Sequence, residues 1–382
     1  MEPSPGSSHR PADPLSRLVE EFGGERDVWC SAPGRLLVTG PGAAREVMGN
    51  RHGRYVDTSD FFHTRHGVFG PRSAQVEIGR AARVLLHRHL AAHRHTLPQL
   101  VEDRLSPFST WPDAGNLLVY AHLADVLLHR DAPQALRDTV ENVIERAVLA
   151  GARARHAALS RLVFRRRAMS ALAAEIQTRR STVRPDPRDL LDVVVAGGGR
   201  EADPAELAEV YLSFVFATVG SIGFALGWAV RLAGTHPGSA DVPQWVVREA
   251  LRLWPVAWLF TRTPRVPHEL AGVAVGPGDT VDVCAFLVHR HPGHWEHPDA
   301  YLPGRWARSP REPAFLPFGH GLHSCAGATF VTALLEDLVR IIVCGRRLSV
   351  TAEGDLPLLG PALAPPRFTA ELGDRTGAPG RR

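Results

Sequence analysis

Hydrophobic and polar positions follow two different periods along the chain. Over 76–100 and 133–185, Ala and Leu recur every three to four positions among arginines, a spacing that predicts helices. Residues 27–48 are typical of a strand, a turn and a helix, and short β-prone stretches lie at 271–275 and 280–283. The pattern predicts one mainly α domain with small β-sheets.

The longest uncharged stretch, Val210 to Val230, predicts a central helix. Asp203 suits its N-cap, Pro204 the first helical position and Glu206 the third, which together form a capping box. Its length would suit a membrane span, but its Ser, Thr and Gly residues do not. A helix that is apolar on all sides also suits the core of a large soluble protein, so we expect no membrane contact. A second helix is predicted from Pro243 to Leu253.

Composition narrows the class of protein further. All 44 basic residues are arginines, as in a GC-rich bacterial genome, and the net charge of +4 is too small and scattered to indicate nucleic-acid binding. We expect Arg165 to Arg167 to form a solvated helix face. The N-terminus lacks a secretory pattern, so we predict a disordered lead over 1–14, one domain over 15–373 and a disordered tail over 374–382.

The cysteines are far apart and form no CxxC or zinc spacing, which predicts a reduced cytoplasmic protein. Cys325 alone lies in a glycine-rich loop, in the run from Phe318 to Gly327. Gly319 and Gly321 allow the backbone angles of a tight loop, and Gly327 allows close approach to a flat cofactor. The apolar run that follows predicts a helix whose N-terminus favours a thiolate.

This loop resembles the haem-binding loop of the cytochrome P450 superfamily, Phe-Gly-x-Gly-x-His-x-Cys-x-Gly, at every fixed position. The resemblance implies a P450 domain that binds haem b, with Cys325 as the ligand of the iron. It implies that His323 reaches a haem propionate and that Phe318 covers the thiolate side. Gly319 and Gly327 belong to the same cofactor-binding loop.

Two upstream segments extend the resemblance. Glu249 and Arg252 fit the family's Glu-x-x-Arg helix, where the i,i+3 spacing puts both side chains on one face. Arg305, in Pro-Gly-Arg-Trp, matches the third member of the family's buried Glu-Arg-Arg network, which is structural. Arg262 and Arg83 are implied as propionate ligands, and Gly79 stands where the family often has a helical histidine.

The oxygen-activation segment departs from the family's Ala-Gly-x-Asp/Glu-Thr. Ala217 is expected beside the haem, Thr218 replaces the glycine, Gly220 replaces the acid and Ser221 replaces the threonine. Gly220 has no side chain to relay protons but leaves space for water. Either Ser221 with ordered water delivers the protons, or the substrate or a water chain does so, or radical coupling or desaturation replaces oxygen insertion. Thr218, three residues earlier, is expected on the same helical face as Ser221.

Other histidines have simpler interpretations. His89 and His93 have the i,i+4 spacing of a zinc pair, but no His-Glu-x-x-His motif is present and we expect an exposed helix face. The run from His289 to His297 is expected to be a structural loop.

The resemblance places the substrate pocket between the loop 57–72, the 165–190 region, the central helix, the segment after Pro255 and a C-terminal lip at 359–364. Its expected lining is mostly aromatic and suits a medium-sized apolar or aromatic natural-product intermediate. The candidate residues are Phe61, Phe62, Phe69, Phe214, Phe224, Ala257 and Trp258.

The leading hypothesis is a bacterial monooxygenase or oxidase of secondary metabolism, such as antibiotic biosynthesis. It would act on a small-molecule or carrier-bound substrate and take electrons from a ferredoxin and its reductase. One alternative is a haem-thiolate catalyst without oxygen insertion, such as an isomerase, a dehydratase or a peroxide-using enzyme. The other is a non-catalytic haem sensor or docking module.

Overall fold

The computed structural model describes residues 14–57, 59, 61–150, 157–182, 184–238, 242–308 and 312–373. The tail predicted over 374–382 and the first thirteen residues of the predicted lead lie outside these ranges. Pro14 is the first residue of a helix. The helices are α1 (Pro14–Phe22), α2 (Pro41–Gly49), α3 (Arg72–His93), α4 (Leu97–Leu105), α5 (Asp113–Leu127), α6 (Gln134–Val143), α8 (Ala158–Arg180), α9 (Leu190–Gly198), α10 (Pro204–Val215), α11 (Ile222–Thr235), α12 (Pro243–Leu253), α13 (Ala285–Val288) and α14 (Ala328–Val339).

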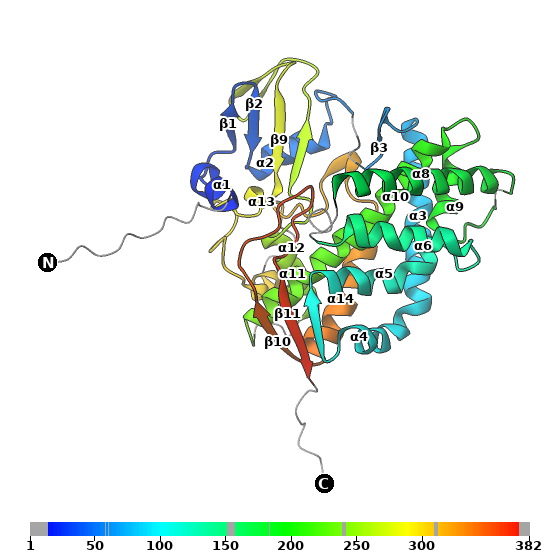
Figure 1. Ribbon diagram of the computed structural model, residues 1–382. Coiled ribbons are helices and arrows are strands. Elements are labelled where there is room, and N and C mark those ends of the chain that lie inside the picture. The colour runs from blue at the N-terminus through cyan, green and yellow to red at the C-terminus, as the bar shows by residue number, and fades with distance from the viewer. Residues whose placement is uncertain are drawn as a thin grey trace, which may run out of the picture.

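Shorter helical turns and strands connect these helices (Figure 1). The turns are η1 (Arg94–Thr96), η2 (Ile144–Val148), η3 (Phe216–Ser221), η4 (Pro303–Ala307), η5 (Gly321–His323) and η6 (Arg340–Cys344). The strands are β1 (Val28–Ala32), β2 (Arg35–Val38), β3 (His63–Thr64), β4 (Gly67–Val68), β5 (Phe108–Trp111), β6 (Leu259–Arg262), β7 (His268–Leu270), β8 (Val273–Val275), β9 (Thr280–Cys284), β10 (Arg347–Ala352) and β11 (Phe368–Gly373).

The strands form small sheets at two ends of a helical body (Figure 1). The largest has the order β1-β2-β9-β6, in which β2 and β9 run parallel. A second sheet has the order β10-β11-β5. The two predicted strands at 271–275 and 280–283 exist as β8 and β9, but β8 pairs with β7 and β9 joins the large sheet. The mainly α fold with small sheets is confirmed.

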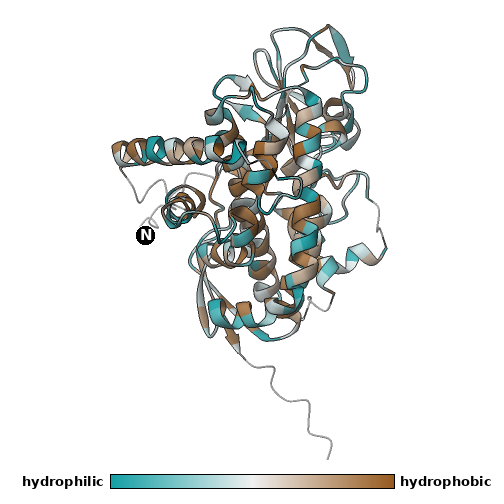
Figure 2. Cartoon of the chain, turned by 90° about the vertical axis from the view of Figure 1, so that its right-hand side faces the viewer, coloured by the Kyte–Doolittle hydropathy of each residue, from teal (hydrophilic) through white to brown (hydrophobic). Residues whose placement is uncertain are grey.

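The central helix is built from α10, η3 and α11, and it packs against α5, α12 and α14. By length and composition alone, Pro204–Thr235 could cross a membrane, yet 72% of its most apolar window is buried within the protein. Trp228 stacks on Trp254 at 4.2 Å between ring centroids, which joins α11 to the end of α12. Hydrophobic residues line these inner helices, while hydrophilic residues lie toward the outside (Figure 2).

At the start of the central helix, the predicted N-cap is found, but the predicted capping box is not. The Asp203 carboxylate accepts the Ala205 amide proton at 3.0 Å and so caps α10. The Glu206 carboxylate accepts the hydroxyl proton of Thr64 at 3.0 Å, which directs it toward β3. The helix also contains a π-helical turn, η3, that the hydrophobic pattern did not predict.

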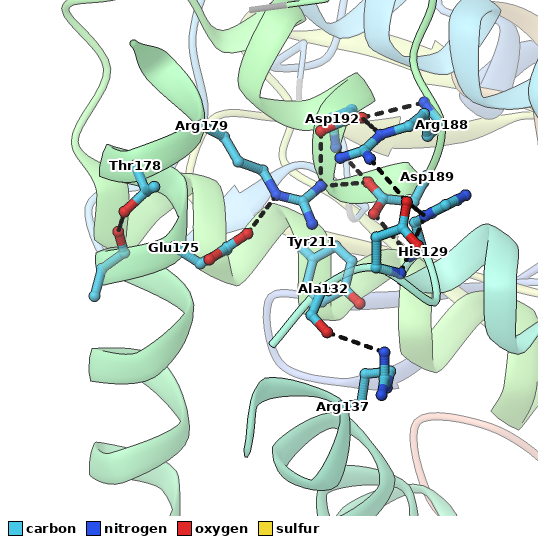
Figure 3. Close-up of polar contacts among 12 residues, drawn as sticks. His129, Ala132, Arg137, Glu175, Thr178, Arg179, Arg188, Asp189, Asp192 and Tyr211 are labelled. Carbon is cyan, nitrogen blue, oxygen red and sulfur yellow. Dashed lines mark hydrogen bonds and ion pairs between the residues drawn. The ribbon is translucent and has the colours of Figure 1, made fainter. Parts of the chain in front are cut away.

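The 165–190 region, expected at the substrate, holds a buried ion network (Figure 3). Arg179 Nη1 lies 2.6 Å from Asp189 Oδ1 and 2.7 Å from Asp192 Oδ1, and its Nε lies 2.8 Å from Glu175 Oε1. The second Asp189 oxygen accepts the His129 amide proton at 2.8 Å, which adds the end of α5. This network joins α8 to α9, so much of the region is structural. Arg165 to Arg167 are exposed on α8, as predicted.

Candidate functional site

The cysteine loop has the tight geometry that its glycines predicted. Gly319 has a φ of 72° and Gly321 a φ of 77°, both in the left-handed region that glycine favours. A Cβ on Gly321 would lie 2.7 Å from the Cα of Gly49, so only glycine lets the loop lie on the end of α2. The Cys325 amide donates to the Phe318 carbonyl at 2.8 Å and closes the loop.

Cys325 is exposed at the end of this loop, just before α14. The Gly327 amide hydrogen-bonds to the sulfur and favours the thiolate. Protein atoms nonetheless crowd the sulfur itself, and this desolvation raises the pKa of the thiol above its ordinary value. The hydrogen bond at the helix N-terminus thus favours the thiolate, but desolvation outweighs it in the protein alone. A metal ion that binds this sulfur must displace the proton.

The other cysteines have different surroundings. Cys284 is fully buried, and burial raises the pKa of its thiol to about 12. Cys30 is exposed, but its sulfur donates to the Ala32 carbonyl within a strand at 3.3 Å. Among the described residues, no group of three or more His, Cys, Asp or Glu side chains could hold a metal ion. The His89 and His93 rings stack on each other, with centroids 4.2 Å apart.

His323 contacts a carboxylate, the kind of group that the sequence analysis assigned to it. Its Nε2 binds the Asp57 carboxylate, and its Nδ1 lies 3.4 Å from the guanidinium of Arg72. Arg72 also donates to the Leu322 carbonyl, which fixes the loop to the start of α3. Asp57 and Arg72 were missed, because no motif links them to a loop some 250 residues away.

The two predicted propionate arginines differ in their surroundings. Arg262 is buried at the end of β6, and its Nη1 donates to the Thr261 carbonyl at 2.8 Å. Arg83 is exposed on α3. A Cβ on Gly79, one turn earlier on α3, would lie 3.6 Å from the Cβ of Ala326, so this helix passes directly beside the cysteine loop.

The structure brings Glu249, Arg252 and Arg305 together as predicted. Arg252 Nη2 lies 2.8 Å and Arg305 Nε lies 3.1 Å from Glu249 Oε1. Glu249 also accepts the Trp306 indole proton at 3.0 Å and the Leu302 amide proton at 3.0 Å. The carboxylate thus receives five hydrogen bonds in a fully buried position. Trp306, where the family pattern has Phe, supplies one of them.

His289 ties this network to the cysteine loop. Its Nδ1–H donates to the Arg252 carbonyl at 3.0 Å, and its Nε2 accepts the Leu316 amide proton at 2.8 Å. Burial lowers the pKa of His289 to about 3, so the ring is neutral at physiological pH. The structural role predicted for this histidine run agrees with these contacts.

The oxygen-activation segment lies in the π-helical turn η3. The buried Thr218 hydroxyl donates to the Phe214 carbonyl at 2.6 Å, whereas Ala217 and Ser221 are half-buried. Thr218 and Ser221 do not share the same environment, because a π turn is wider than an α turn and changes the spacing of a face. A Cβ on Gly220 would lie 3.3 Å from Val148 Cγ1. The space expected there for water is thus bounded by Val148 of η2.

The predicted pocket residues separate into three groups. Phe61 meets Phe214 edge to face at 4.7 Å between centroids, so the first loop reaches α10. The indole of Trp258 donates to the Gly360 carbonyl at 3.0 Å, which places the segment after Pro255 beside the predicted C-terminal lip. Ala257 is exposed in that segment. Phe214 is buried in the main hydrophobic core, and so are the remaining aromatic residues: Phe62, Phe69 and Phe224.

Comparison with known proteins identifies the same family. Residues 241–339 match the family model described as Cytochrome P450. Cyclooctatin synthase of Streptomyces melanosporofaciens is 33% identical over 178 residues, 38% of this chain and 39% of that protein. Pentalenene oxygenase of Streptomyces avermitilis is 29% identical over 225 residues, 49% of each. The chain therefore spans less than half the length of these curated relatives.

The likeness of fold extends over nearly the whole chain. P450 OxyD, involved in the biosynthesis of vancomycin-type antibiotics, superposes with a TM-score of 0.70 at 18% identity, over 94% of this chain and 96% of that one. Proteins of this family and fold bind haem iron through a cysteine thiolate. The chain belongs to the cytochrome P450 family, and its cofactor is a haem with a thiolate-ligated iron.

Proposed function

We propose that this protein is a monooxygenase-type P450 oxidoreductase of bacterial secondary metabolism, with Cys325 as the ligand of the haem iron. One observation carries the proposal. Cys325 is an exposed cysteine at the end of a loop with two left-handed glycines, and it directly precedes a helix N-terminus. The buried Cys284 lacks such a loop.

The residues around Cys325 suit a haem by their chemistry. The sulfur accepts one backbone hydrogen bond, from Gly327, and the soft thiolate is a suitable ligand for iron. His323 already contacts a carboxylate, and Arg72 beside it adds a cation, so the pair suits a haem propionate. Arg262 is a further candidate for a propionate, and Arg83 is an exposed one. When bound, the haem supplies the redox chemistry that activates oxygen.

Ser221 is the proton donor in this proposal. It is half-buried at the end of η3, and its hydroxyl has no hydrogen-bond partner within the described part of the chain. It can therefore bind a water and pass a proton through it. Thr218 keeps its hydroxyl on the Phe214 carbonyl and is the weaker donor.

The aromatic contacts and the relatives support a proposed class of substrate. Phe61 and Phe214 form an apolar wall between the first loop and the central helix. The names of the two curated relatives, cyclooctatin synthase and pentalenene oxygenase, favour a natural-product substrate, and the aromatic wall favours an apolar one. We propose that a ferredoxin and its reductase deliver the electrons. We also propose that the protein acts in the cytoplasm.

A second candidate is haem-thiolate catalysis without oxygen insertion. It is favoured by Gly220, which occupies the acid position and packs against Val148. Turnover separates the two candidates. The monooxygenase requires both an electron donor and oxygen and adds an oxygen atom to the product, whereas an isomerase or dehydratase consumes neither.

The test of the iron ligand is Cys325→Ala. Without the thiolate, the carbon monoxide difference band typical of a thiolate-ligated ferrous haem should disappear. Cys344→Ala is the matched control and should keep the band. If the band survives in Cys325→Ala and disappears in Cys344→Ala, then Cys344 is the iron ligand and the proposal is wrong.

A further inference from the structure

The π-helical turn η3 receives hydrogen bonds from another helix. Asn116 of α5 is fully buried, and its Nδ2 lies 2.8 Å from the Val219 carbonyl oxygen and 3.1 Å from that of Gly220. A π turn interrupts the regular ladder of i→i−4 bonds, so backbone groups within it need other partners. The amide of Asn116 supplies both of its protons to this turn.

Two glycines allow this contact. A Cβ on Gly223 would lie 2.4 Å from Asn116 Nδ2 and 2.6 Å from the Asn116 Cα, so a side chain there would expel the asparagine. A Cβ on Gly115 would lie 2.9 Å from the Gly223 carbonyl oxygen. The backbones of α5 and α11 therefore touch directly, next to the oxygen-activation segment.

The other end of the same amide is not used. Asn116 Oδ1 is buried and has no hydrogen-bond partner among the residues that the structure describes. An unsatisfied buried oxygen destabilises the fold, and an apolar side chain of similar size would avoid that cost. The contribution of Asn116 therefore lies in the two protons that it donates.

We propose that Asn116 is a positioning residue for proton delivery, an inference that rests on the function proposed above. The two carbonyls that it binds immediately precede Ser221, the last residue of the turn. By holding the turn in its π geometry, Asn116 sets the direction in which the Ser221 hydroxyl points. Without these hydrogen bonds, the wide turn can shift along the helix, and Ser221 changes direction.

The first test measures the turn itself in the haem-loaded protein. Asn116→Leu keeps the approximate size and removes both donors, and Leu123→Ala is a control at a buried residue on the same helix. Backbone hydrogen exchange over 216–224 should accelerate roughly tenfold in Asn116→Leu, because two hydrogen bonds are lost, and far less in the control. Equal exchange in the two variants overturns the inference. Asn116→Ala, a smaller side chain that also removes both donors, replaces Asn116→Leu if that variant does not fold.

The second test measures the share of reducing equivalents lost to hydrogen peroxide. Asn116→Leu should raise this loss severalfold, and it should add nothing to Ser221→Ala, because both changes act on the same hydroxyl. An additive loss in the double variant overturns the inference. If Ser221→Ala loses reducing equivalents to peroxide but Asn116→Leu does not, the inference about Asn116 is overturned and the proposed function stands. A fully coupled Ser221→Ala overturns the Ser221 relay itself.

Discussion

Two hydroxyls three residues apart on the central helix have different surroundings. Thr218 is buried and its hydroxyl proton is engaged by the helix backbone, whereas Ser221 is half-buried at the end of the π turn. A hydroxyl that already donates within its own helix must break that bond before it can donate elsewhere. The structure therefore distinguishes two residues that the sequence placed on one face.

We expect Ser221→Ala to divert reducing equivalents into peroxide while substrate binding stays intact. A positioned proton donor contributes about 10²–10⁴-fold to a rate, so the loss of coupling should be large. Thr218→Val is the control and should stay coupled, because it removes only a hydroxyl that bonds to its own helix. The measurement is product formed per NAD(P)H consumed. Equal uncoupling by both variants would contradict this assignment.

One carboxylate holds α12 and the residues around η4 together. Glu249 of α12 receives hydrogen bonds from Arg252 on its own helix, and from Leu302, Arg305 and Trp306 around η4. A buried charge group is stable only while every member is paired, so the elements depend on one another.

Glu249→Ala should destabilise the fold by about 3–5 kcal/mol, because it leaves two guanidinium groups without their carboxylate. Trp306→Phe is a matched change at the same site that removes a single donor, and it should cost only about 1 kcal/mol. Urea unfolding measures both, with haem content as a second readout. A stable, fully haem-loaded Glu249→Ala protein would show that the network does not support the scaffold.

At the scale of the whole molecule, the cysteine loop joins two parts of the chain. Its first half lies on α2, through Gly321 and Gly49, and its second half lies beside α3, through Ala326 and Gly79. The part with the large sheet and the helical body thus meet at Cys325. Any condition that loosens the whole fold should therefore also loosen the site.

Acid is such a condition, because burial lowers the pKa of His122 to about 4 and that of His289 to about 3. Both rings stay neutral in the folded protein, while the unfolded chain takes up protons below about pH 6.5. The stability that they contribute is complete above that pH and decreases as the pH falls. At pH 5, each of the two histidines should lower the free energy of unfolding by about 2 kcal/mol.

Urea unfolding at pH 7.5 and pH 5 measures this decrease. The variant His122→Leu should lose about 2 kcal/mol less than the unchanged protein between the two pH values, because one proton-binding difference is removed. An equal decrease in both proteins would show that His122 titrates normally in the fold.

Local patterns predicted the features that are local in the chain. The Asp203 cap, the helix Pro243–Leu253 and the left-handed glycines at 319 and 321 all depend on near neighbours, and all three are found. The Glu249 to Arg305 network was predicted through the family resemblance. Contacts between distant segments leave no comparable local pattern in the sequence.

The contacts that were missed are all of that kind. Asn116 and Val219 are 103 residues apart, and Asp57 and His323 are 266 apart. An asparagine within an apolar helix was a visible signal, but only the folded chain names its partner. The π turn was also missed, because periodicity averages over several turns and a single wide turn scarcely changes it.

The π turn also constrains how the gene can change. A π-helical turn holds one residue more than an α-helical turn, so each of its residues turns the chain by less than the roughly 100° of an α-helix. Deleting one codon within 216–221 would therefore restore a regular helix while α11 keeps nearly its present rotation relative to α10, and Trp228 would stay stacked on Trp254. The deletion would instead remove the wide turn whose carbonyls Asn116 binds. A one-residue deletion in this turn should therefore spare the fold and harm the site.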